Sequence, residues 1–218
     1  MKKLLIVLAL INLFPSISSG ATLNLQVGVS SDDARQAGST MLLTGVSLPH
    51  GDVSGGEYNP GYRFTGVSGL SGMTINSATL TFKAATTNSG NMIGDWYAHD
   101  AEAPGTFTTA SNNITSRPRT TATSEGDGVD FGNWTVNNNY TFTGDGVNTI
   151  ADIIQELADS YDPSTIALLW IVSASPTNAE RRVTSYDTSS SNAAKLDIDY
   201  TPLTPSVVAP IRRVYIIE

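Results

Sequence analysis

The sequence feature that most constrains the fold is a continuous apolar run, Ile166-Ala167-Leu168-Leu169-Trp170-Ile171-Val172, preceded by Thr165. A β-strand points successive side chains to opposite faces, so a strand with one face in solvent alternates apolar and polar residues. This segment has the length of a strand but lacks the alternation. It therefore predicts a central strand over residues 165–172 that is covered on both faces.

Shorter strand-type segments occupy much of the remaining chain and are separated by Gly, Ser, Asn and Thr. Near the start, Leu23, Leu25, Val27 and Val29 alternate with polar residues, as in a strand with one buried face. The other candidate strands are Thr40–Val46, Tyr62–Val67, Ile75–Lys83, Asn91–His99, Asn139–Thr143, Arg182–Tyr186 and Lys195–Tyr200. This pattern predicts an all-β sandwich, and one such domain accounts for residues 21–201.

One helix is expected at about residues 149–161. Its apolar residues follow the helical spacing of a single buried stripe, at Ile150, Ile153, Ile154, Leu157 and Ala158. Thr149 is a favourable N-cap with Asp152 three residues later, and Asp162-Pro163 ends the segment because proline restricts the residue before it. We expect this helix to close one open end of the sandwich; binding a partner through its apolar face is the alternative.

Residues 1–20 have the order of a secretory signal peptide. Lys2 and Lys3 precede an apolar segment from Leu4 to Phe14, and small residues follow at Ser18-Ser19-Gly20-Ala21. The apolar segment is shorter than the roughly 20 residues that a membrane span needs. We therefore expect a secreted protein, extracellular or on the cell surface, with an uncleaved membrane anchor as the alternative.

Residues 202–218 form a Pro-rich tether followed by a strand-like tail. The prolines are at 202, 205 and 210, and they favour an extended segment. The apolar end, Val214-Tyr215-Ile216-Ile217, has the character of a strand that can add to the sheet edge of a neighbouring molecule. The alternative is that the tail folds back on its own domain.

The composition excludes several classes of function. The chain has 20 acidic and 12 basic residues, and two of the basic ones, Lys2 and Lys3, lie in the signal segment. Such an acidic domain is a poor partner for nucleic acid or anionic membranes, which require a basic face. With no cysteine and two histidines, thiol catalysis and Cys- or His-rich metal sites are not expected, and burial must supply the stability.

Two long segments, Ser47–Gly61 and Asp100–Asn138, are rich in turn residues and are predicted as loops. Connections of that length usually carry function or are mobile. The second of them contains most of the candidate ligand-binding residues described below.

Several stretches in a consistent order resemble extracellular bacterial β-sandwich modules, related to the DNRLRE and disaggregatase-associated carbohydrate-binding-type domains. The resemblance covers about residues 27–201. The matching pieces are Asp32-Asp33-Ala34, Gly61-Tyr62-Arg63-Phe64, the strand from Met73 to Phe82, Ser116 to Ala122, Ile153-Ile154-Gln155-Glu156, Arg181 to Asp187, and Ala194 to Tyr200. It implies an antiparallel jelly-roll-like sandwich that is associated with glycan binding. Such modules usually accompany a catalytic or adhesive domain, and none is recognisable in this sequence.

Glycan sites in such sandwiches stack a sugar ring on an exposed aromatic residue and hold hydroxyls with polar side chains. Trp134 lies among Gly and Asn residues, which makes it a candidate for an exposed, ligand-binding ring, with burial in the domain as the alternative; Tyr140 follows closely. Arg117 and Arg119 flank a proline in a loop, where two guanidinium groups can bind a carboxylated or sulfated glycan. Salt bridges to the acidic surface are the alternative for both arginines. Trp170 and Trp96 are expected in the core.

The pair Asp32-Asp33 is a candidate for structural calcium, because this ion binds several carboxylate and carbonyl oxygens. Other loop carboxylates that could contribute are Asp127, Asp130, Asp145 and Asp187. None has EF-hand spacing, and Asp127-Gly128 and Asp145-Gly146 are also ordinary turn sequences.

The sequence contains no nucleophile elbow, phosphate-binding loop or zinc-protease helix, and a pair of carboxylates alone is not specific for glycoside hydrolysis. We therefore expect a secreted, non-catalytic module that binds polysaccharide or a cell-surface glycan, as in adhesion. The alternative is a structural subunit of an extracellular layer or filament that assembles through its C-terminal strand.

Overall fold

The computed structural model describes residues 20–126 and 131–202 of the 218-residue chain. The predicted signal peptide and the assembly strand Val214-Tyr215-Ile216-Ile217 lie outside the described residues. Within them, no helix combines the length and the apolar character that crossing a membrane requires.

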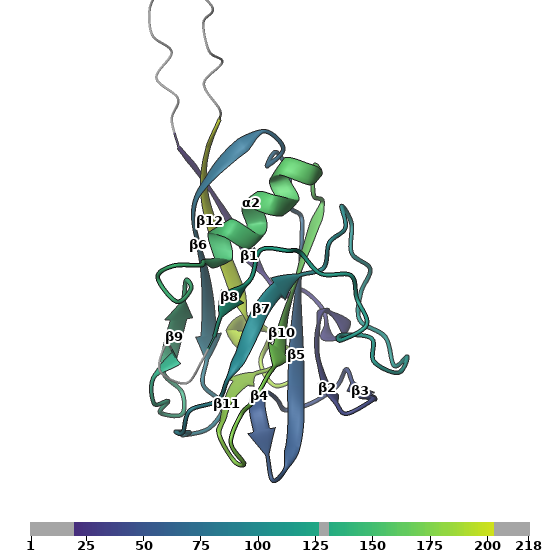
Figure 1. The fold of residues 1–218 in the computed structure, drawn as a ribbon, viewed down its shortest axis with the longest axis vertical. Coiled ribbons are helices and arrows are strands. Elements are labelled where there is room, and N and C mark those ends of the chain that lie inside the picture. Colours follow the sequence, from purple (N-terminus) through teal and green to yellow (C-terminus); the bar gives the residue numbers. More distant parts are fainter. Residues whose placement is uncertain (1–19, 127–130, 203–218) are drawn as a thin grey trace, which may run out of the picture.

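The described residues form two antiparallel sheets packed face to face, which confirms the predicted all-β sandwich (Figure 1). The smaller sheet has the order β1-β12-β6-β9, with strands Ala21–Gln26 (β1), Lys195–Pro202 (β12), Met73–Lys83 (β6) and Asn139–Phe142 (β9). Because β1 and β12 are antiparallel and Ala21 pairs with Tyr200, the described residues begin and end at the same end of the molecule.

The larger sheet has the order β11-β4-β5-β10-β7-β8. Its strands are Glu180–Thr184 (β11), Ser47–Val53 (β4), Gly56–Thr65 (β5), Thr165–Val172 (β10), Gly94–Ala98 (β7) and Ser124–Glu125 (β8). Two further strands, Asp33–Ala37 (β2) and Thr40–Leu42 (β3), extend it through pairing of β2 with β5. Short 3₁₀ turns occur at Ser30–Asp32 (η1) and Ser190–Asn192 (η2).

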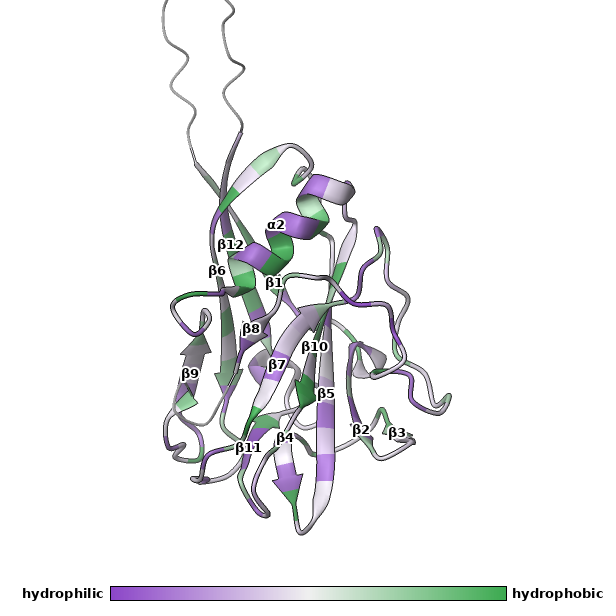
Figure 2. Cartoon of the chain, viewed as in Figure 1, coloured by the Kyte–Doolittle hydropathy of each residue, from purple (hydrophilic) through white to green (hydrophobic). Residues whose placement is uncertain are grey.

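Strand β10 confirms the prediction of a central strand covered on both faces, and it pairs with β5 on one side and β7 on the other. On its inner face, Ile166, Leu168 and Trp170 belong to the main core between the sheets. On its outer face, Ala167 and Leu169 belong to a second apolar cluster. Figure 2 shows the apolar colouring of β10 at the centre of the larger sheet.

The second cluster exists because the long connection after β7 folds back over the outer face of the larger sheet. Phe107 and Ile114 from this connection are buried against Ala167 and Leu169. The Phe107 amide donates to the Ser31 carbonyl at 3.0 Å, which fixes the connection to η1. The predicted loop nature of this segment is confirmed over its described residues, apart from the two residues of β8 and Phe131, which has a helical conformation.

The predicted helix is confirmed as α2, Ile150–Ser160. The Thr149 hydroxyl accepts from the Asp152 amide and the Asp152 carboxylate accepts from the Thr149 amide, so both halves of a capping box are formed. The apolar stripe is buried, and α2 packs against β6 and β7, which belong to different sheets. The Gln155 side chain also bonds the backbone of β6, through the Ile75 amide and the Met73 carbonyl.

Two predictions for the first third of the domain are wrong. Ser47–Gly61 is not a long loop but the hairpin of β4 and β5, whose turn places Ser54 and Gly55 at positive φ. All of β4 except its last residue is buried, so the strand has no alternating pattern to reveal it. The strand predicted over Thr40–Val46 is formed only over Thr40–Leu42.

Candidate ligand-binding pocket

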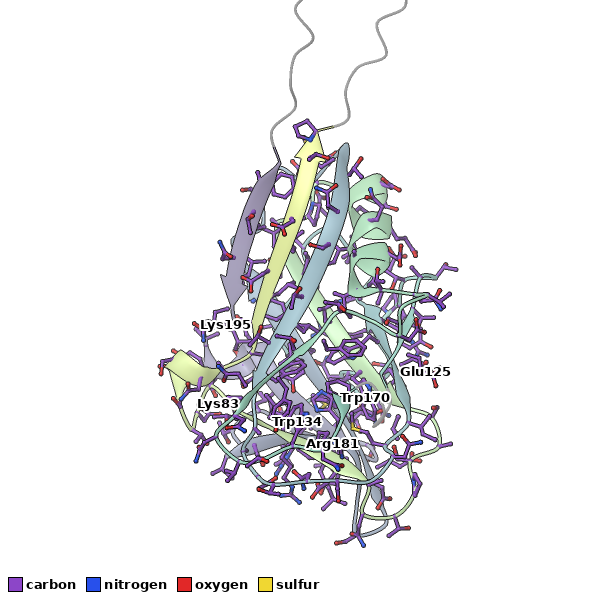
Figure 3. All side chains as sticks on the ribbon, turned by 90° about the vertical axis from the view of Figure 1, so that its left-hand side faces the viewer. Lys83, Glu125, Trp134, Trp170, Arg181 and Lys195 are labelled. Atoms are coloured by element: carbon purple, nitrogen blue, oxygen red, sulfur yellow. The ribbon has the colours of Figure 1, made fainter. Side chains whose placement is uncertain are left out.

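Trp134 is not exposed, and the prediction of an exposed ring there is wrong. Its side chain is 1 % exposed, its ring stacks on Tyr140 with centroids 4.9 Å apart, and its indole N–H donates to the Phe131 carbonyl at 3.0 Å. The neighbouring Gly and Asn residues lie in turns with exposed side chains, but the ring itself lies inside the sandwich (Figure 3), with its centroid 5.8 Å from that of the Phe131 ring. A ring in this position has no free face for a sugar. Trp96 and Trp170 are buried in the core, as predicted.

Tyr140 is half-buried and supports the same turn. One face of its ring covers Trp134, and its hydroxyl oxygen accepts a hydrogen bond from the Thr135 amide at 2.7 Å. The hydroxyl and one face of the ring are therefore already used within the domain.

Arg117 is buried and organises its own loop. Its guanidinium lies 4.4 Å from the centre of the Phe107 ring and donates to the carbonyl oxygens of Gly105, Thr106 and Asn113. It is 9 % exposed, so neither the expected ligand contact nor the alternative of a surface salt bridge describes it. Arg119, two residues later, is exposed, and its guanidinium lies 4.8 Å from the centre of the Tyr97 ring.

Asp32 and Asp33 do not share a site. The Asp32 carboxylate is buried and receives a hydrogen bond from the Arg63 guanidinium at 2.7 Å. The Asp33 carboxylate accepts from the Tyr186 amide at 2.6 Å, and burial raises its pKa to about 7. Within residues 20–126 and 131–202, no group of three or more acidic, His or Cys side chains is placed to hold a metal ion.

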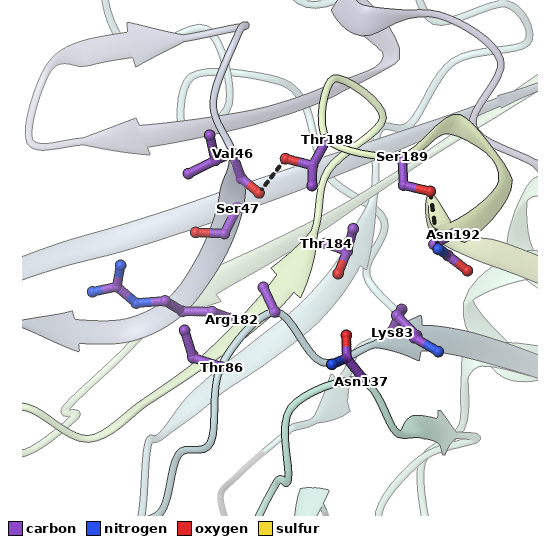
Figure 4. A pocket seen from close by; sticks show the side chains of 11 residues that line it. Val46, Ser47, Lys83, Thr86, Asn137, Arg182, Thr184, Thr188, Ser189 and Asn192 are labelled. Atoms are coloured by element: carbon purple, nitrogen blue, oxygen red, sulfur yellow. Dashed lines mark hydrogen bonds between the residues drawn. The ribbon is translucent and has the colours of Figure 1, made fainter.

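The structure places a different set of polar residues around one pocket of about 380 Å³ (Figure 4). The pocket lies where the end of β6 meets β11, the start of β4 and the turn that precedes β12. The lining residues are small, hydroxylated, amide or basic: Val46, Ser47, Lys83, Ala85, Thr86, Asn137, Arg182, Thr184, Thr188, Ser189 and Asn192.

Backbone bonds between the two sheets make this pocket a fixed part of the fold. Ala84 pairs with Val183, and the Ala85 amide donates to the Arg182 carbonyl at 2.8 Å. The Asn137 amide donates to the Ala84 carbonyl at 2.9 Å, and Asn137 itself adopts a φ of 69°, a conformation that asparagine tolerates.

Several polar groups of the pocket are free to bind a ligand. In the part of the chain that the structure describes, the side chains of Ser47, Thr184 and Asn137 form no hydrogen bond. Others support the walls: the Thr188 hydroxyl donates to the Val46 carbonyl at 2.7 Å, and the Asn192 amide donates to the Ser189 hydroxyl at 2.9 Å.

The pocket is basic although the chain carries a net charge of −8. Arg182 donates to the Glu180 carboxylate at 2.9 Å, which neutralises its charge. Lys83 has no ion pair among the described residues. A smaller adjoining pocket of about 50 Å³ is lined by Lys83 together with Lys195. Figure 3 shows these two lysines near each other at one end of the smaller sheet.

Sequence patterns alone did not single out these residues. The pocket joins positions from 46 to 192 through pairings between strands distant in sequence, and its hydroxyls and amides are common residue types. One signal was available: outside residues 1–20, Lys83 and Lys195 are the two lysines of the chain.

No model of a known protein family matches this chain, and no curated protein matches its sequence. The resemblance to extracellular glycan-associated modules therefore stays a prediction, and the function is argued from the pocket.

Proposed function

We propose that this protein is a secreted, non-catalytic module that binds a polysaccharide or cell-surface glycan in the pocket at the junction of β6 and β11. The observation that carries the proposal is the set of unpaired side chains, from Ser47, Asn137 and Thr184, which line one cavity whose walls are joined by backbone hydrogen bonds. The signal-like N-terminus and the resemblance to extracellular modules support the same assignment.

The size and chemistry of the pocket suit a sugar. Its volume of about 380 Å³ falls in the range of roughly 300–1,000 Å³ that is common for small-molecule sites. Most such sites are largely apolar, whereas hydroxyl and amide groups line this one and can both donate to and accept from sugar hydroxyls. Val46, which is 77 % exposed, adds an apolar wall.

The lining favours binding over hydrolysis. Glycoside hydrolysis commonly needs two carboxyl groups flanking the bond that is cleaved. The described residues of this pocket include no carboxylate, imidazole or thiol.

The test is a binding measurement of the purified chain on a glycan array, followed by titration calorimetry of each hit. Asn137→Gly removes the pocket amide while glycine keeps the positive φ without strain. We expect affinity to fall about fivefold, the effect of one hydrogen bond of about 1 kcal/mol.

The matched control is Asn112→Gly. Asn112 also has a positive φ, of 61°, but it lines a different pocket, beside Gln36 and Asp52. Unchanged affinity is expected for this variant. The same affinity in both variants, or the absence of any glycan hit, would refute the proposed site.

A second function is favoured by strand β1. Among the described strands, β1 pairs only with β12, so its other edge is open to a further strand. We propose assembly as the alternative function, with the Val214–Ile217 tail of one molecule pairing with β1 of the next. Deleting residues 205–218 is then expected to convert concentration-dependent oligomers to monomers in sedimentation experiments, and monomers before the deletion would exclude this function.

A further inference from the structure

We propose that the polysaccharide is acidic and that one of its carboxylate or sulfate groups binds between Lys83 and Lys195. This inference rests on the proposed function and adds the chemical class of the ligand. It follows from where the fold places two positive charges on a negatively charged domain.

The two lysines lie on the same outer face of the smaller sheet. Lys195 of β12 pairs directly with Thr81 of β6, and Lys83 lies two residues further along β6. Side chains two residues apart on a strand share a face, so the lysines are diagonal neighbours, whose Cα atoms are typically about 7–8 Å apart. Like charges at this distance repel each other, and an anion between them removes the repulsion.

No acidic side chain of the described chain neutralises either lysine. The ion pairs among the described residues join Arg63 to Asp32 and Arg182 to Glu180. The nearest acid along the same face of β12, Asp197, lies two residues beyond Lys195 and forms no ion pair with it. In a chain with 20 acidic residues, an unpaired basic pair indicates a site for an anion from outside.

The place for such an anion adjoins the proposed sugar pocket. The cavity between the lysines, of about 50 Å³, is also lined by Thr81, Asn139 and Asn192, all of which carry hydrogen-bond donors. Its size suits a carboxylate or sulfate. Lys83 and Asn192 line both cavities, so a sugar in the larger one can extend its charged group into the smaller one.

The walls of the small cavity are held in place. The Gln26 side-chain amide of β1 donates to the carbonyl oxygens of Ser190, Ser191 and Ala193 at 3.0–3.1 Å. These bonds fix the turn that contains Asn192 and leads directly into Lys195, the first residue of β12.

The test uses two pairs of polymers, and the two members of each pair share a backbone but differ in charge. Homogalacturonan with free carboxylates is compared with its methyl ester, and dextran sulfate is compared with dextran, by titration calorimetry on the purified chain. We expect the charged member of at least one pair to bind about tenfold more tightly than its neutral counterpart. The pair that shows the difference identifies the anion as carboxylate or sulfate.

The double variant Lys83→Gln/Lys195→Gln is expected to remove that difference, because each exposed ion pair contributes about twofold to fivefold in affinity. Lys83→Arg/Lys195→Arg keeps the charges and is expected to keep the preference. Arg119→Gln removes an exposed charge that lies over the Tyr97 ring and lines neither cavity, so it controls for general attraction; it is expected to change affinity less than twofold.

The outcomes separate the two proposals. Equal binding of charged and neutral polymers, weakened by Asn137→Gly, overturns the acidic ligand and supports the glycan pocket. A preference for the charged polymer that persists in the double glutamine variant also overturns the anion site. Binding to none of the four polymers overturns the anion site, and the glycan array then decides the proposed function separately.

Discussion

Phe107 packs directly on Gly61: a Cβ atom at position 61 would lie 2.5 Å from the Cζ atom of the Phe107 ring. Non-bonded carbon atoms do not approach so closely, so the Phe107 ring occupies space that is available because Gly61 has no side chain. The contact joins β5 to the long connection after β7. It therefore holds the second apolar cluster on the outer face of the larger sheet.

Gly61→Ala is expected to lower the free energy of unfolding by about 1–3 kcal/mol, since overpacking forces the ring or the strand to move. Urea unfolding followed by fluorescence measures this change. The matched control is Gly105→Ala in the same connection, because a Cβ there has no neighbour within 4 Å. Equal stability of the two variants would contradict the packing argument.

Trp134→Ala is expected to destabilise the fold by about 3–5 kcal/mol, because it removes a fully buried ring and leaves a cavity. Tyr140→Phe keeps the stacked ring and removes only the acceptor for the Thr135 amide, so about 1 kcal/mol is expected. Chemical denaturation gives both values. If Trp134→Ala abolished glycan binding while leaving stability unchanged, the ring would be a ligand contact after all.

The elements that the sequence predicted well are those defined by local periodicity. The helix stripe with its Thr149 cap and the apolar run of β10 each contain their own pattern, and both are formed within a residue or two of the expected bounds. Strand β4 was missed because it is buried on both faces and interrupted by Pro49 and Gly51, which resemble turn residues.

The site could not be predicted in the same way. Trp134 has polar neighbours in sequence, yet Tyr140 and the core cover its ring; such burial depends on tertiary contacts. Arg117 similarly looks like a surface residue of a loop, and only the folded connection surrounds it with carbonyl groups. The pocket depends on the pairing of β6 with β12 and on the bridge between Ala84 and Val183, which no local pattern contains.

Two buried groups give the stability of this domain opposite dependences on pH. Burial raises the pKa of Asp33 to about 7, so its favourable contribution is complete below pH 3.8 and is lost as the pH rises through about 7. Burial lowers the pKa of His50 to about 3, so its contribution is complete above pH 6.5 and is lost as the pH falls through about 3.

Between about pH 4 and 6.5 the two contributions oppose each other, each with a slope of about 1.4 kcal/mol per pH unit. In Asp33→Asn, the contribution of His50 is the one of the two that remains, so the free energy of unfolding is expected to rise with pH in this window. His50→Gln is expected to give the reverse slope. Urea unfolding at several pH values measures both, and parallel pH profiles of the two variants would show that neither pKa is shifted as described.

Removal of Arg63 is expected to be more harmful than removal of the whole ion pair. Arg63→Met leaves the Asp32 carboxylate buried beside the Thr106 hydroxyl without its cation, and loss of about 3–5 kcal/mol is expected. Arg63→Met/Asp32→Asn removes the charge as well, so part of that loss should be recovered. A double variant less stable than Arg63→Met would show that the buried charge is not what destabilises the single variant.

The Asp32 carboxylate is already paired with the Arg63 guanidinium, so it is not available to bind a metal ion. Addition of calcium or of a chelator should therefore leave the melting temperature of the unmodified chain unchanged. Stabilisation by calcium would instead assign Asp32 to a metal site.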